Sequence, residues 1–325
     1  MKNATEQMLE KLSMAGIIPV IKVDEAKDAV PLCKALLHGG LPAAEITFRT
    51  AAAEEAIRRV HEELPEVMLG AGTVLTCEQA DKAWKAGAGY IVSPGLNQEV
   101  VRHCIDRGYP VLPGCSSPTD IEAAMGMGIL TVKFFPAEAL GGLDMIKALS
   151  GPYGDIRFVP TGGITSENLT SYLNFPKVAA CGGSWMVPQE AVKGGDWDRI
   201  ERLAAEAVAK VLGFELWHIG VNCEDADKAA QAAQKLSFLT GWPLHRDNSS
   251  SVFVGPGFEV MKTNYRGRHG HIALACSSVE RAMWHLQRRG FGFDLDTLLL
   301  QEDGKPKFVY VDEEIAGFAL HLVNK

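Results

Sequence analysis

Eight short apolar runs, separated by helix-forming segments, dominate the first two thirds of this 325-residue chain. Segments rich in Ala, Glu, Lys and Arg lie between the runs, such as AAAEEAIRRVHEEL and TCEQADKAWKAGA. Strands that alternate with helices pair in parallel, and eight such units predict a closed (β/α)8 TIM barrel. An open doubly wound sheet is the alternative α/β architecture. The runs cover residues 17–23, 43–48, 68–74, 90–95, 111–115, 131–136, 157–162 and 178–184.

The alternation stops near Gly213, after the helical segment DWDRIERLAAEAVAKVLG, and two similar halves follow. The first half opens with LWHIGVNCEDADKAAQAAQKL and the second with GHIALACSSVERAMWHLQRRG. Each half reads as a strand, a helix and about three strands in hairpins. A chain of 325 residues also exceeds the usual size of one hydrophobic core. The sequence therefore predicts a barrel over residues 1–213, followed by a smaller α+β domain of paired βαβββ modules over residues 214–325.

Composition limits the kinds of molecule that this protein is expected to bind. The formal net charge is -8 and no long basic run occurs, which argues against nucleic acid as a main partner. No segment has the roughly 18 uncharged apolar residues of a membrane span, and the first residues lack the pattern of an export signal. The seven cysteines are scattered and contain no CxxC pair, as expected for reduced thiols. We expect a cytoplasmic protein that acts on small molecules.

One lysine interrupts the sixth apolar run, in the segment ILTVKFFPAEALGG at residues 129–142. Lys133 follows Val132 and precedes Phe134 and Phe135, so apolar side chains should exclude water from its amine. Desolvation disfavours the ammonium form of an unpaired lysine, and the neutral amine is a nucleophile. A lysine that forms an ion pair, or that extends its amine to the surface, is the alternative interpretation.

The carboxyl ends of the strands in a TIM barrel meet at one mouth, which is where such barrels hold their active sites. A lysine amine there can add to a substrate ketone, lose water and form an imine that accepts electrons when the next carbon–carbon bond breaks. Glu45 would move the protons that this chemistry requires, and the planar guanidinium of Arg49 suits a carboxylate. A solvated glutamate and a helix-capping arginine are the simpler alternatives. The mouth positions are Glu45, Arg49, Thr73, Pro94, Lys133, Phe135, Gly162, Gly163 and Ser184.

Two glycine clusters follow the seventh and eighth runs, namely TGGI at residues 161–164 and GGS at residues 182–184. Glycines let the backbone approach an anion closely, and the start of a following helix favours negative charge. The loops after the seventh and eighth strands are a common phosphate site in TIM barrels. Each cluster alone is also compatible with a tight turn, but their joint occurrence in this pair of loops predicts a phosphorylated ligand.

Two segments carry a resemblance to a known family. GGLPAAEITFR at residues 39–49 and GILTVKFFPAEALG at residues 128–141 resemble the signature segments of 2-keto-3-deoxy-6-phosphogluconate (KDPG) and 4-hydroxy-2-oxoglutarate (KHG) aldolases. GAGTV, SPG and PTGGI are similar to that family as well, and the similarity spans residues 1 to about 212. The resemblance implies a class I aldolase that needs no cofactor, because a covalent imine on its lysine replaces a metal ion.

The resemblance also implies a role for each mouth residue. Lys133 would form the imine and Glu45 would move protons, while other residues would bind the phosphorylated keto acid. The implied reactions cleave KDPG to pyruvate and glyceraldehyde 3-phosphate, and KHG to pyruvate and glyoxylate. 2-Keto-3-deoxy-6-phosphogalactonate, which differs at one hydroxyl, is the alternative substrate, and members of the family usually form homotrimers. The implied binding residues are Arg49, Thr73, Pro94, Phe135, Thr161, Gly162, Gly163, Gly183 and Ser184.

Residues 214–325 resemble, in pattern rather than in motif, the vicinal oxygen chelate fold of glyoxalases, extradiol dioxygenases and antibiotic-resistance proteins. In that fold the first and last strands of each half supply metal ligands. The halves align His218 with His271 and Met261 with His321, while Glu259 lies two residues before Met261. The candidate ligands are therefore the three histidines and Glu259, and imidazoles suit a divalent zinc, iron or nickel ion. A small-molecule binding or regulatory module and a separate metal-dependent enzyme both remain open for this domain.

Overall fold

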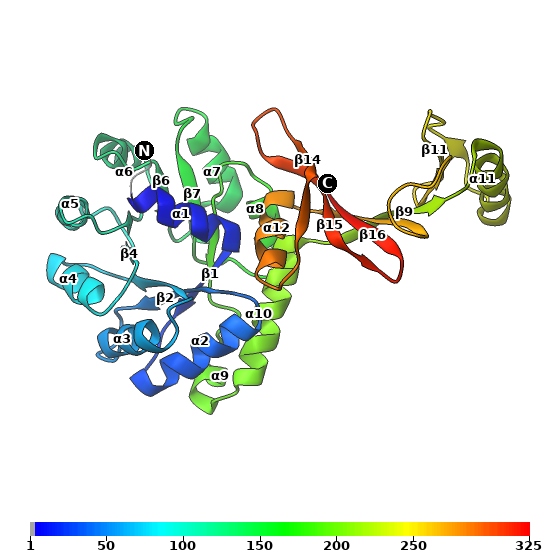
Figure 1. The fold of residues 1–325 in the computed structure, drawn as a ribbon. Helices are drawn as coiled ribbons and strands as arrows, with labels where there is room; N and C mark the ends of the chain where they lie inside the picture. The colour runs from blue at the N-terminus through cyan, green and yellow to red at the C-terminus, as the bar shows by residue number, and fades with distance from the viewer. Residues whose placement is uncertain (1–3) are drawn as a thin grey trace. The chain divides into compact units, whose positions relative to one another are not determined.

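The computed structural model describes residues 4–325, which divide into two compact units. Unit 1 ends at Val211 and unit 2 runs from Leu212 to Lys325, next to the boundary predicted at residue 213. Figure 1 shows the helices and strands of each unit. Among residues 4–325, no helix is both long enough and apolar enough to cross a bilayer.

Eight short parallel strands form the centre of unit 1. Seven of them begin at the first residue of a predicted apolar run, and all eight end before their run does. The last residues of each run therefore lie beyond the end of the assigned strand, at the carboxyl end where the mouth of a barrel lies. The strands are β1 (Ile17–Ile21), β2 (Ala43–Thr47), β3 (Met68–Gly72), β4 (Tyr90–Val92), β5 (Val111–Leu112), β6 (Thr131–Phe134), β7 (Arg157–Pro160) and β8 (Cys181–Gly183).

These strands follow one another around a barrel in chain order, and the last returns to the first. A six-stranded sheet has the order β5-β4-β3-β2-β1-β8, and β6 pairs with β7. Single parallel bridges from Gly114 to Lys133 and from Thr161 to Gly182 connect the two sheets at both ends. The parallel order and its closure confirm the predicted TIM barrel over the open doubly wound alternative.

Helices cover the outside of the barrel, as Figure 1 shows. In the third of them the buried residues Ala53, Ala56, Ile57 and Val60 have the spacing of one helical face, and this helix packs on β2 and β3. The helices are α1 (Ala4–Ala15), α2 (Ala29–His38), α3 (Ala53–Glu63), α4 (Cys77–Lys85), α5 (Gln98–Asp106), α6 (Pro118–Gly126), α7 (Gly142–Ser150), α8 (Leu169–Leu173), α9 (Gln189–Gly194) and α10 (Trp197–Leu212), with 3-10 turns η1 (Ala26–Asp28) and η2 (Glu138–Leu140).

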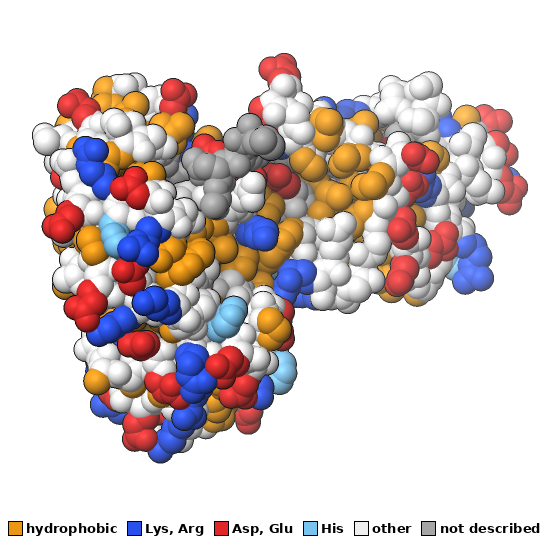
Figure 2. All heavy atoms as spheres, turned by 60° about the vertical axis from the view of Figure 1, so that its left-hand side comes forward, with side chains coloured by type: hydrophobic (Ala, Val, Ile, Leu, Met, Phe, Trp, Pro, Cys, Tyr) orange, Lys and Arg blue, Asp and Glu red, His pale blue; other side chains and the backbone are white. Residues whose placement is uncertain are grey.

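Charges of both signs are interspersed on the face of unit 1 that is turned to the viewer in Figure 2. Several charged residues of unit 1 are paired within one helix. Arg58 of α3, for example, lies 2.7 Å from carboxylate oxygens of both Glu55 and Glu62.

Unit 2 consists of two modules with the same order of elements. Together they form one eight-stranded sheet with the order β10-β11-β12-β9-β13-β16-β15-β14. β9 and β13 pair antiparallel at its centre, so an approximate two-fold axis relates the modules. The first module comprises β9 (Glu215–Asn222), α11 (Ala226–Thr240), β10 (Leu244–His245), β11 (Ser251–Val254) and β12 (Phe258–Met261), and the second β13 (Gly270–Cys276), α12 (Val279–Gln287), β14 (Phe293–Leu300), β15 (Pro306–Ile315) and β16 (Phe318–Asn324).

Candidate functional site

The predicted nucleophile and the predicted proton shuttle face each other inside the barrel. Lys133 Nζ donates a hydrogen bond to Glu45 Oε1 at 3.1 Å, and the two residues are only 5% and 3% exposed. Lys133 lies on β6 and Glu45 on β2, so the pair spans the barrel interior. The Lys133 amine therefore forms an ion pair with a carboxylate, which is one of the alternatives that the sequence left open, and it does not extend to the surface. The same carboxylate is within reach to take a proton from the amine and to return it.

Glycines of β3 make room for the side chains in this interior. A Cβ atom at Gly72 would lie 2.2 Å from Glu45 Oε1 and 2.7 Å from its Cγ, so only glycine leaves the carboxylate its place. Gly70 likewise accommodates the ring of Tyr90, which is buried and donates a hydrogen bond to Ala44 O at 3.3 Å. The sequence pattern did not single out Gly72, although a glycine directly before the mouth residue Thr73 was an available signal.

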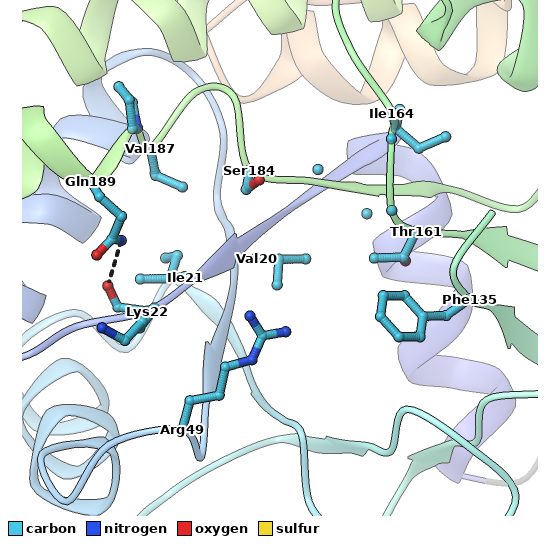
Figure 3. Close-up of a pocket in the computed structure, with 15 residues that line it drawn as sticks. Val20, Ile21, Lys22, Arg49, Phe135, Thr161, Ile164, Ser184, Val187 and Gln189 are labelled. Carbon is cyan, nitrogen blue, oxygen red and sulfur yellow. Dashed lines mark hydrogen bonds between the residues drawn. The ribbon is translucent and has the colours of Figure 1, made fainter. Parts of the chain in front are cut away.

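Arg49 and Thr73 lie together at the mouth. Arg49 Nε donates to Thr73 Oγ1 at 3.2 Å. Figure 3 shows the terminal nitrogens of the Arg49 guanidinium directed into the cavity. Thr73 has a φ of +57°, a left-handed conformation that is rare for a β-branched residue. Strain of this kind persists where the surrounding structure fixes a functional side chain.

A cavity of about 440 Å³ opens at this mouth. Figure 3 shows Arg49, Phe135, Thr161 and Ser184 around it. Lys133 and Glu45 are not among the residues that line the cavity, and Lys133 Nζ lies 5.7 Å from the centroid of the Phe135 ring, which does line it. Val20 and Gln189 also line the cavity and were not predicted from the sequence. The predicted residues in the lining are Arg49, Phe135, Thr161, Gly162, Gly163, Gly183 and Ser184.

Pro94, the remaining predicted residue, packs against the backbone beside Lys133. A Cβ atom at Gly114 would lie 2.1 Å from Pro94 O, and Gly114 forms the ladder bridge to Lys133. Seven of the eleven predicted residues of the first unit thus line the cavity, and Thr73 contacts one of them. Glu45 contacts Lys133, and Pro94 lies beside Gly114, which pairs with Lys133.

The two glycine clusters lie next to each other on the cavity wall. Gly162 and Gly163 have φ values of +98° and +81°, which glycine adopts most readily. Within residues 4–325, no hydrogen bond uses the N–H groups of Gly163 or Ile164. Free amides on a cavity wall form a favourable site for an anion.

Residues 8–203 match the family described as KDPG and KHG aldolase, which is more than half of the chain. The chain belongs to the KDPG and KHG aldolase family. A 2-dehydro-3-deoxy-phosphogluconate aldolase from Treponema pallidum is 50% identical over 201 residues, which are 62% of this chain and 96% of the relative. The matched residues end before unit 2 begins, so the family assignment concerns unit 1.

Solved structures agree with this assignment. A KDPG aldolase from Legionella pneumophila, with pyruvate captured as a covalent carbinolamine intermediate, superposes with a TM-score of 0.60 at 40% identity, covering 61% of this chain and 97% of the other. A 2-keto-3-deoxy-6-phosphogluconate aldolase from Zymomonas mobilis with 3-phosphoglycerate has a TM-score of 0.59 at 37% identity, covering 63% and 95%. The first unit of this KDPG and KHG aldolase family member is a class I aldolase, which is a lyase.

A second candidate site lies on the sheet of unit 2. His218, His271 and His321 are all buried, and each offers a nitrogen within 4.8 Å of the other two. The Nε2 atoms of His218 and His271 are 3.0 Å apart, and Glu259 Oε2 lies 3.1 Å from the first and 3.2 Å from the second. The other carboxylate oxygen of Glu259 accepts a hydrogen bond from Ser251 Oγ at 2.7 Å. We call the three histidines and Glu259 the histidine cluster.

The strand register corrects one alignment made from the sequence. Glu259 pairs with Gly220, and His321 pairs with Ala273, while Gly220 and Ala273 occupy equivalent positions after the first-strand histidines. The structural equivalent of His321 is therefore Glu259 and not Met261. The sequence alignment was two residues out because it counted along the chain and could not see the pairing between strands.

Burial affects the ionisation of the histidine cluster. It lowers the pKa of His321 to about 3, so that imidazole is neutral at neutral pH. Burial alone would raise the pKa of Glu259, but hydrogen bonds with His218, His271 and Ser251 outweigh it, and the pKa is lowered. The cluster therefore combines an ionised carboxylate with a neutral imidazole, as a divalent cation requires of its ligands.

Proposed function

We propose that unit 1 cleaves KDPG to pyruvate and glyceraldehyde 3-phosphate, and KHG to pyruvate and glyoxylate, through an imine on Lys133. The buried contact of 3.1 Å between Lys133 Nζ and Glu45 Oε1 carries this proposal. The amine adds to the substrate ketone, and Glu45 supplies the proton with which the hydroxyl leaves as water. Glu45 then removes the proton of the substrate's 4-hydroxyl group, and the bond between carbons three and four breaks. Its electrons move into the imine, the resulting enamine is protonated, and water releases pyruvate.

Different residues around the cavity would bind different parts of the substrate. Arg49, held by Thr73, would bind the carboxylate beside the ketone, because the free edge of its guanidinium faces the cavity. Phe135 and Pro94 would form the apolar walls next to the imine. The phosphate would lie at the glycine clusters, where amide groups are free. The residues proposed for the phosphate are Thr161, Gly162, Gly163, Gly183 and Ser184.

Trapping of the covalent intermediate tests this proposal. We expect incubation of the full-length protein with pyruvate and sodium borohydride to reduce the imine to a stable amine. Peptide mass spectrometry should then find the added mass on Lys133. An adduct on another lysine would contradict the assignment, and the absence of any adduct would contradict the imine mechanism.

The alternative substrate is 2-keto-3-deoxy-6-phosphogalactonate. Its phosphate and its ketone would occupy the same positions, and only one hydroxyl would differ. Pyruvate release from each of the three keto acids under identical conditions distinguishes the assignments, since the preferred substrate has the largest kcat/KM.

We also propose that the protein is a homotrimer in a reducing, cytoplasmic environment. The seven free cysteines support the reducing environment. Sedimentation equilibrium measures the number of subunits.

We propose further that unit 2 is a vicinal oxygen chelate module that holds a divalent metal ion. The triangle formed by two Nε2 atoms and Glu259 Oε2, with edges of 3.0, 3.1 and 3.2 Å, carries this proposal. Ligands bound to one ion at about 2.0 to 2.2 Å lie at such distances from one another. Imidazoles and a carboxylate suit zinc, iron or nickel.

Metal analysis tests the second proposal. The full-length protein is incubated with zinc, nickel or ferrous ion, desalted, and measured by elemental analysis beside the His218→Ala/His271→Ala variant. We expect about one ion per chain in the wild type and none above background in the variant. No ion in either protein would leave a small-molecule binding or regulatory module as the function of unit 2. A bound ion would make a separate metal-dependent reaction worth assaying.

A further inference from the structure

Glu138 lies against the glycine loop that follows β7 and has no part in the mechanism above. A Cβ atom at Gly163 would lie 2.5 Å from Glu138 Cγ and 2.6 Å from its Cβ, so the loop backbone rests on the stem of this side chain. The Glu138 carboxylate accepts a hydrogen bond from the hydroxyl of Tyr172, a residue of α8 that is 2% exposed. The Glu138 amide donates to Gly162 O at 3.1 Å. Glu138 is thus attached both to the loop and to a buried anchor.

Asn168 holds the same loop from its other end. Its Nδ2 donates to Gly163 O at 3.0 Å, and its Oδ1 accepts from Thr165 N at 2.9 Å. The carbonyl groups of Gly162 and Gly163 are therefore both used by the protein, whereas the amide groups of Gly163 and Ile164 are not used within residues 4–325. This arrangement leaves the amides free for a ligand in the cavity.

We propose that Glu138, Tyr172 and Asn168 form a clamp that holds the Gly162–Gly163 loop in its anion-binding conformation and so sets the preference for phosphorylated substrates. The inference rests on the proposed phosphate site. Two successive glycines have many accessible conformations, so without the clamp the phosphate would have to order the loop as it binds. A substrate without a phosphate does not use these amides, so its binding does not include the free-energy cost of ordering the loop. The three residues are positioning residues, because they act through the loop and do not touch the reacting atoms.

Steady-state kinetics of the full-length protein with KDPG and with KHG test the clamp. Glu138→Ala and Asn168→Ala should each raise KM for KDPG about tenfold, as expected for the loss of one hydrogen bond, and leave kcat within about twofold. KM for KHG should stay within about twofold of wild type. Glu138→Gln keeps the stem and an oxygen that can accept the Tyr172 hydrogen bond, so it should restore nearly the wild-type KM for KDPG.

The chain offers a matched control. Tyr153 Oη donates to Glu122 Oε1 at 2.8 Å, which is the same kind of contact on the exposed surface of the barrel. Glu122→Ala should change neither KM. Tyr172→Phe removes only the hydroxyl and keeps the buried ring, so it replaces Glu138→Ala if that variant does not fold.

Two outcomes would overturn the clamp. One is an unchanged KM for KDPG in folded Glu138→Ala and Asn168→Ala, and the other is an equal rise in KM for both substrates. Ser184→Ala, measured in the same series, separates this failure from that of the phosphate site. If Ser184→Ala weakens only KDPG while the clamp variants do not, the phosphate site stands and the clamp is wrong. If Ser184→Ala affects both substrates equally, the phosphate site fails and the clamp fails with it.

Discussion

The barrel mouth and the histidine cluster both bury ionisable side chains, but they balance them differently. At the mouth, the donor Lys133 Nζ meets the acceptor Glu45 Oε1 at 3.1 Å, so the two groups satisfy each other. In unit 2, two imidazole nitrogens and a carboxylate oxygen converge. The carboxylate can accept from both imidazoles, but the 3.0 Å contact between the two nitrogens then has no acceptor. The comparison teaches that the charge and hydrogen-bonding capacity of the neighbouring groups, rather than burial alone, separate the proposed imine site from the proposed cation site.

Of the changes that test this comparison, Lys133→Ala should have the largest effect on activity. The variant lacks the nucleophile, so we expect turnover of KDPG to fall by at least about 10⁴-fold. Metal binding to unit 2 should not change, because the histidine cluster uses no residue of the barrel. Lys147→Ala, which removes an exposed lysine paired with Asp144, is the matched control and should keep full activity. Residual turnover above one hundredth of wild type would contradict the role of Lys133.

Glu45→Gln should have the next largest effect. The amide keeps the size of the side chain but cannot accept and return protons, so we expect turnover to fall by about 10²- to 10⁴-fold. Borohydride trapping of pyruvate should be slower and still directed to Lys133. Turnover within a few fold of wild type, in a variant with an unchanged melting temperature, would remove Glu45 from the mechanism.

A glycine substitution tests the histidine cluster, the other site in the comparison. A Cβ atom at Gly220 would lie 2.1 Å from His271 Cε1 and 2.5 Å from its Nε2, so Gly220→Ala should displace this ring. We expect metal affinity to fall by about 10- to 100-fold, as when a contact that orients a ligand is lost, with no change in aldolase turnover. Competition with a chromophoric chelator measures the affinity.

Gly126→Ala is the control for this substitution, because an added Cβ atom there meets nothing within 4 Å. Equal metal affinity in wild type and Gly220→Ala would mean that His271 is not a ligand in its present orientation.

Chelation should have the smallest effect on the aldolase. An imine mechanism needs no metal ion, so treatment with excess EDTA followed by desalting should leave turnover of KDPG within about twofold of the untreated protein. The same treatment should remove any ion from unit 2. A loss of turnover that added zinc restores would show that the two sites depend on each other.

The sequence by itself determined the barrel and predicted which residues lie at its mouth. Seven strands begin where the apolar runs begin, because a buried parallel strand needs a local apolar run and turn residues around it. The topology then brings the carboxyl ends of the strands together, so the sequence could predict that Lys133, Glu45 and Arg49 share one site. The paired modules of unit 2 were equally visible, since their repetition is a pattern along the chain.

Only the tertiary structure decided which side chains touch. Lys133 and Glu45 are 88 residues apart, and their contact depends on the width of the closed barrel. The choice of Glu259 over Met261 depends on strand register, which is set by hydrogen bonds between distant segments. The spaces at Gly72 and Gly220 exist because another chain segment passes close by. Local patterns specify the elements, whereas contacts across a sheet or a barrel are decided by how those elements pack.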